Sequence, residues 1–112
     1  MAHFSTHVLD TTRGQPAAGI LIDLHSLGGG ERRSLHTFTT GADGRAGGIQ
    51  LDPGLYELTF RAGDYFRAAG IALADPPFLD EVVIRFGVSD PAGRYHVPLL
   101  LAPHSYTTYR GT

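Results

Sequence analysis

Short runs of alternating apolar and polar residues, separated by turn signals, are the feature that most constrains this sequence. Side chains point alternately to the two faces of a β-strand, so each run predicts a strand with one buried face. The runs span residues 4–10, 19–27, 34–40, 47–51, 55–61, 80–88, 94–102 and 105–110. About eight short strands at regular spacing are typical of an all-β sandwich or barrel.

The segments between these runs carry turn chemistry. Gly, Pro and Asp recur where the chain must reverse, in GQPAAG (14–19), GGG (28–30), ADGR (42–45), DPG (52–54) and SDPAG (89–93). One segment departs from alternation. DYFRAA, residues 64–69, has Asp near its start and Gly70 after its end, which predicts one short helix.

Composition limits the class of protein. A chain of 112 residues with 42% hydrophobic residues supports one core, which predicts a single domain over residues 1–112. Cysteine is absent, so disulfides and thiolate chemistry are excluded. The net charge of -2 is interspersed, so we expect no nucleic-acid partner. With no signal-peptide pattern and no apolar run near the roughly 20 residues of a bilayer span, we expect a cytoplasmic protein without membrane contact.

Alternation also predicts which way two histidines point. In residues 94–102 the apolar positions 95, 97, 99 and 101 form one face, so His96 points away from the core. In residues 4–10 the alternate positions 4, 6 and 8 are the better candidates for burial, so His7 also points outward. If these outer faces meet another subunit, both imidazoles lie in a shared groove.

Outward histidines suit proton transfer, because the unperturbed imidazole pKa lies nearest neutrality. A solvated or structurally hydrogen-bonded role is the alternative for each. Arg45, in the Asp-Gly-Arg turn, is either a solvated loop charge or a ligand for a planar anion. His3 and His7 share a face and would need a third ligand to bind a metal; without an HExxH spacing we expect none.

Other common chemistries lack their motifs. No serine lies in a G-x-S-x-G elbow, which disfavours a serine-hydrolase triad. The three glycines at 28–30 lack the Lys-Ser/Thr of a phosphate-binding loop. The C-terminal sequence, residues 109–112, ends on an aromatic, a cation and a glycine before Thr112. A docked tail is one interpretation, and a disordered tail is the ordinary expectation for a chain end.

Several separated motifs together resemble the 5-hydroxyisourate hydrolases, also called transthyretin-related proteins. They are THVLDTTRGQPAAG, ADGR, PGLYELTF, DYF, YHVPLLLAP and the terminal YRGT, in the same order and covering essentially the whole chain. The Asp-Gly turn and PGLYELTF are common among prealbumin-like sandwiches. The combination of HVLDT, YHVPLLLAP and YRG is the specific part.

This resemblance implies a two-sheet antiparallel transthyretin-like sandwich of about eight strands with one short helix. It implies a homotetramer with active sites between dimers, a 5-hydroxyisourate substrate and no cofactor. By position, the catalytic residues are His7, Arg45 and His96, and His7 and Arg45 also bind substrate. Tyr109, Arg110, Gly111 and Thr112 match the family's substrate-pocket signature.

A departure at the C-terminal residue and two alternative functions accompany the resemblance. The family usually ends in serine, whereas this chain ends in Thr112, which keeps the hydroxyl and adds a methyl group. We expect activity to survive this change. A non-catalytic small-ligand carrier, or a structural domain on the same sandwich, is the alternative, because one fold hosts many functions.

Overall fold

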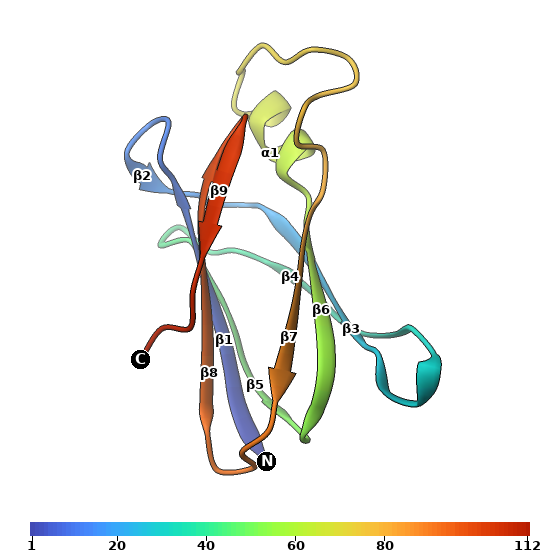
Figure 1. Cartoon of the computed structure of the whole chain (residues 1–112). Helices are drawn as coiled ribbons and strands as arrows, with labels where there is room; N and C mark the ends of the chain where they lie inside the picture. Colours follow the sequence, from blue (N-terminus) through green and yellow to red (C-terminus); the bar gives the residue numbers. More distant parts are fainter.

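The structure, a computed structural model, describes residues 1–112 as two β-sheets packed face to face (Figure 1). The strands are β1 (Ala2–Asp10), β2 (Gln15–Pro16), β3 (Leu21–Ser26), β4 (Arg33–Thr39), β5 (Arg45–Leu51), β6 (Gly54–Phe60), β7 (Val82–Val88), β8 (Arg94–Ala102) and β9 (Ser105–Thr108). One α-helix, α1 (Ala62–Ala68), and a 3₁₀ turn at Gly28–Gly30 complete the elements. The predicted all-β sandwich with one short helix is confirmed.

Strand order brings distant segments together. In the first sheet, called sheet A, β1 pairs with β2 and β5 on one side and with β8 on the other, and β9 follows β8. The second sheet, sheet B, has the order β4-β3-β6-β7. All pairs are antiparallel except β1 with β8, which run parallel. This one parallel pair places the N-terminal strand beside a strand about 90 residues later, with Ser5 directly opposite His96.

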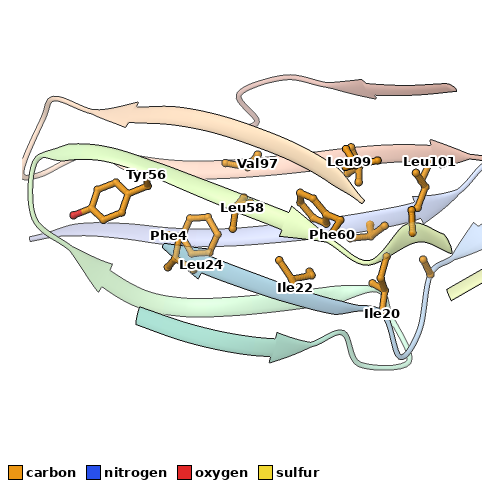
Figure 2. Close-up of a cluster of buried hydrophobic side chains, with 14 of the residues drawn as sticks. Phe4, Ile20, Ile22, Leu24, Tyr56, Leu58, Phe60, Val97, Leu99 and Leu101 are labelled. Carbon is orange, nitrogen blue, oxygen red and sulfur yellow. The ribbon is translucent and has the colours of Figure 1, made fainter. Parts of the chain in front are cut away.

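The hydrophobic core fills the space between the sheets (Figure 2). Apolar side chains from both sheets alternate inward, and Phe4, Phe60, Leu99 and Leu101 are fully buried. The predicted inward faces of β1 and β8 are confirmed, because Phe4 and Val8 on β1 and residues 95, 97, 99 and 101 on β8 are buried. Truncating a buried leucine of this core to alanine costs about 2–5 kcal/mol.

Two local features differ from the sequence prediction. Segment 14–19, expected as a turn, contains the two-residue strand β2, which forms only because Gln15 and Pro16 pair with the end of β1. Helix α1 begins at Ala62, two residues earlier than expected, because Ala62 and Phe66 are buried against the core. No helix in the structure combines the length and apolar character needed to cross a membrane.

A buried polar network ties the end of β1 to α1. Asp10 is fully buried and accepts hydrogen bonds from the Arg13 Nε at 2.9 Å and the Tyr65 hydroxyl at 2.8 Å. Burial by itself would raise the pKa of Asp10, but these hydrogen bonds outweigh it, so the pKa lies below its ordinary value. The charge of Asp10 is therefore compensated inside the fold.

Candidate active site

The predicted catalytic residues meet on the outer face of sheet A, where β1 lies between β5 and β8. Residues opposite one another on paired strands share a face, and His7 lies opposite Arg45 on β5. Ser5, two residues before His7 and on the same face, lies opposite His96 on β8. Three strands thus bring His7, Arg45 and His96 to one surface.

A small polar hollow of about 200 Å³ opens on this surface. Its lining residues are polar and come from β1, β5, β8 and the C-terminal end: His3, Ser5, Arg45, Arg94, His96 and Thr112. No Asp or Glu side chain lines it. A hollow with two guanidinium groups and two imidazoles is suited to bind a small anion.

His96 is the best-placed proton acceptor in this hollow. Partial burial lowers its pKa, and the nearby Arg45 and His7 lower it further, while hydrogen bonding at Ser5 acts in the opposite direction. The net pKa is below the ordinary histidine value. His96 is therefore neutral at neutral pH and able to accept a proton.

His7 flanks the hollow and is held in a different way. Its Nε2 lies 2.8 Å from the backbone carbonyl oxygen of Asp43 in the turn before β5. A carbonyl can only accept a hydrogen bond, so Nε2 of His7 carries the proton. This bond ties the imidazole of His7 to the turn that positions Arg45.

The two arginines of the hollow form no strong ion pair with an acidic side chain. The Nε of Arg45 is 3.8 Å from a carboxylate oxygen of Asp43, and both side chains are well exposed. An exposed pair at this distance contributes little energy, so it leaves the guanidinium available. The side chain of Arg94 forms no ion pair.

The C-terminal end docks beside His96, as the sequence suggested. The backbone N–H of Gly111 donates to the His96 carbonyl at 2.8 Å, and Thr112 lines the hollow. Tyr109 and Arg110 lie elsewhere in the single chain, along a separate hollow bounded by β7. There the Arg110 guanidinium stacks 4.2 Å from the centre of the Tyr95 ring. One chain therefore brings two of the four predicted tail residues to the His96 surface.

Three lining residues were not predicted as site residues. His3 and Ser5 share the outer face of β1 with His7, and Arg94 shares the outer face of β8 with His96. Strand alternation placed all three on these faces, so the signal was present. What the sequence did not contain was the parallel pairing of β1 with β8, which makes the two faces one surface.

A larger hollow, about 330 Å³, lies between α1 and the start of β3. Its two arginines are already paired, Arg13 with Asp10 and Arg61 with Asp23 at 2.8 Å. The sheet A hollow therefore has more unpaired positive charge than this one.

In the whole chain no three His, Cys, Asp or Glu side chains are grouped so that they would hold a metal ion.

Comparison with solved structures shows the same sandwich in a 5-hydroxyisourate hydrolase and in a transthyretin. The 5-hydroxyisourate hydrolase of Klebsiella pneumoniae superposes with a TM-score of 0.84 at 32% identity, covering 100% of both chains. The transthyretin of Sparus aurata superposes with a TM-score of 0.86 at 25% identity, covering 96% of this chain and 95% of that one.

Sequence comparison gives a higher identity, to a protein named as the hydrolase. The protein named 5-hydroxyisourate hydrolase 2 of Rhizobium meliloti is 51% identical over 113 aligned positions, which cover 96% of this chain and 94% of the relative. The family model described as HIUase/Transthyretin family matches residues 4–111. The chain belongs to the HIUase/Transthyretin family.

Proposed function

We propose that this chain hydrolyses 5-hydroxyisourate in urate degradation, at the hollow on the outer face of sheet A. Water adds to the C6 carbonyl and the N1–C6 amide bond breaks, which opens the six-membered ring to 2-oxo-4-hydroxy-4-carboxy-5-ureidoimidazoline. The observation that carries the proposal is the neutral His96 beside the free cations Arg45 and Arg94. The 51% identity to a protein named as this hydrolase supports the choice of substrate.

His96 is the proposed general base. Its lowered pKa keeps it unprotonated at neutral pH, where it takes a proton from the attacking water. A positioned general base contributes about 10²- to 10⁴-fold in rate. His7, held by the Asp43 carbonyl, shares the work by lowering the His96 pKa and by orienting the substrate or the water.

Arg45 and Arg94 bind the anionic, carbonyl-rich substrate and stabilise charge that develops on oxygen during attack. Donors placed in this way contribute about 3–4 kcal/mol each to transition-state stabilisation. Product formation creates a carboxylate, and the hollow has no Asp or Glu side chain to repel it. The reaction uses an activated lactam and a positioned water, so we propose no cofactor.

The tail residues Tyr109, Arg110, Gly111 and Thr112 complete the proposed substrate pocket. Thr112 reaches the hollow in the same chain, whereas Tyr109 and Arg110 line the hollow beside β7. Contacts of these two residues with the substrate would then come from a neighbouring subunit. We therefore propose a homotetramer, located in the cytoplasm, in which the open outer faces of sheet A meet between dimers.

The test follows the ultraviolet absorbance of 5-hydroxyisourate, produced from urate by excess urate oxidase. With this protein at catalytic concentration, the intermediate should decay faster than it does spontaneously. Decay at the spontaneous rate, together with saturable binding of an oxidised purine, would favour the ligand-carrier alternative.

A further inference from the structure

The imidazole of His96 is held on two sides by the chain itself. Its Nδ1 lies 2.8 Å from the Ser5 hydroxyl on β1. Its opposite edge faces Gly111, where a Cβ atom would lie 2.6 Å from Cδ2 of the ring. Its Nε2 has no hydrogen-bond partner in the protein. The ring therefore presents one nitrogen to the hollow and keeps the other on Ser5.

The position of Ser5 is built by three strands. It lies opposite His96 in the parallel pair and opposite Gly47 in the antiparallel pair, next to a register shift between Phe4 and Ser5. Gly47 has φ +106°, and a Cβ there would lie 2.8 Å from the Ser5 Cα. Only glycine lets β5 approach β1 this closely, so the backbone at Ser5 is fixed from both sides.

Gly111 has a matching role on the other edge of the ring. Its N–H donates to the His96 carbonyl, which holds the tail on the β8 backbone. Because it has no side chain, its backbone packs directly against the imidazole carbon edge. This gives a physical reason for glycine at this position of the C-terminal tetrapeptide.

We propose that Ser5 is a positioning residue that holds His96 as the Nδ1–H tautomer, with Gly111 as the steric stop, so that the Nε2 lone pair faces the attacking water. The inference deepens the proposed hydrolase function and rests on it for its kinetic consequence. The tautomer itself is a property of the resting protein.

A serine hydroxyl can donate or accept, and the placement of the ring favours accepting here. Nε2 has no partner in the protein and faces the hollow, so it is the nitrogen free to accept the proton of the water; this leaves the ring proton on Nδ1, 2.8 Å from the Ser5 oxygen. The Nδ1–H bond then persists through the reaction. Nε2 takes a proton as the water oxygen bonds to C6 and returns it to N1 as the C6–N1 bond breaks, while Nδ1–H continues to donate to Ser5.

The test combines histidine ¹⁵N NMR on the resting protein with steady-state kinetics, for wild type, Ser5→Ala and Ser5→Thr. The wild type and Ser5→Thr should show His96 protonated at Nδ1. Ser5→Ala should shift it toward the Nε2–H form that imidazole prefers in water. The kcat of Ser5→Ala should fall about 10- to 100-fold with KM within about twofold, because one hydrogen bond to a charged group is lost. Ser5→Thr keeps the hydroxyl and should restore kcat.

The two readouts separate this inference from the proposed function. An Nδ1–H tautomer that depends on the Ser5 hydroxyl supports the positioning role even if the protein does not open 5-hydroxyisourate. An Nε2–H tautomer in the wild type, or an unchanged tautomer and kcat in Ser5→Ala, would overturn it even if hydrolysis is fast.

Discussion

Charged side chains are paired with opposite charges on the outer face of sheet B, whereas those on the outer face of sheet A are largely unpaired. On sheet B, the carboxylate of Glu57 is buried and lies between two arginines, 2.7 Å from Arg32 and 3.1 Å from Arg85. Asp23 on the same face pairs with Arg61 at 2.8 Å. Hydrogen bonds from Arg32 outweigh burial and hold the pKa of Glu57 below its ordinary value. These charges compensate one another and stabilise the fold.

On sheet A the charges are left without partners. Arg45 has only a loose contact with Asp43, Arg94 has none, and no Asp or Glu side chain enters the hollow. A cluster of uncompensated cations attracts an anion, and one of the two, Arg45, also lowers the pKa of His96. The difference between the faces separates residues that stabilise the sandwich from residues that we propose act on a ligand.

The largest expected effect is on the outer face of sheet A, the proposed site. Arg45→Ala should lower kcat about 10²- to 10³-fold, because it removes a positive donor at the reacting carbonyl. The matched control is Arg32→Ala on sheet B, a similarly exposed arginine that lines neither the sheet A hollow nor the hollow beside β7. Steady-state kinetics and thermal unfolding should show lost turnover with unchanged Tm for the first and unchanged turnover for the second. Equal losses of turnover in the two variants would contradict the assignment of turnover to the outer face of sheet A alone.

Glu57→Gln on sheet B should lower stability and leave turnover unchanged, the reverse of the effect expected for Arg45→Ala. The change keeps the shape of the side chain but removes the charge that both arginines contact, so the free energy of unfolding should fall by about 1–2 kcal/mol. Denaturant unfolding at a fixed protein concentration measures it, and kcat should be unchanged. If kcat fell while the free energy of unfolding stayed the same, Glu57 would contribute to turnover and not to stability.

Acidification should weaken the paired regions. A carboxyl group whose folded pKa is lowered contributes stability above its unfolded pKa and loses it as the pH falls through the folded value. Asp10, Asp23 and Glu57 all have lowered pKa values, so stability should decline below about pH 4. Asp10→Asn should flatten part of this decline in unfolding curves measured across pH. An unchanged slope would mean that the Asp10 network does not contribute.

The smallest effect concerns the pH profile of the site. The charge of Arg45 is one cause of the lowered His96 pKa, so Arg45→Ala should move the acid limb of its residual kcat to higher pH, by less than about one unit. Arg94→Ala is the comparison, since Arg94 is not among the causes of that shift. A shift to lower pH in Arg45→Ala would mean that His96 is not the titrating base.

The strand faces were predictable from the sequence because alternation is a local property. It placed His7 and His96 outward, and the burial of their neighbours confirms both. Strand β2 was missed because two residues carry no periodicity and form a strand only by pairing with β1. The helix start was shifted because Arg61, the residue before Ala62, makes no side-chain capping bond that the sequence would reveal.

The site was less predictable than the fold. Spacing alone left Arg45 as a loop charge, and only the family resemblance joined it to the two histidines. The hydrogen bond between Ser5 and His96 links residues 91 positions apart, through a parallel pairing that no local pattern encodes. Partial burial lowers the His96 pKa, and Gly111 of the docked tail, which is distant in sequence, packs against its ring.

The most direct test of the proposed site compares His96→Asn with Glu57→Gln in the absorbance assay for 5-hydroxyisourate, at equal concentrations of folded protein. With His96→Asn, we expect the intermediate to decay near the spontaneous rate. With Glu57→Gln, we expect it to decay at the wild-type rate despite the lower stability of the variant. Wild-type decay with His96→Asn would contradict the assignment of the chemistry to the unpaired face of sheet A.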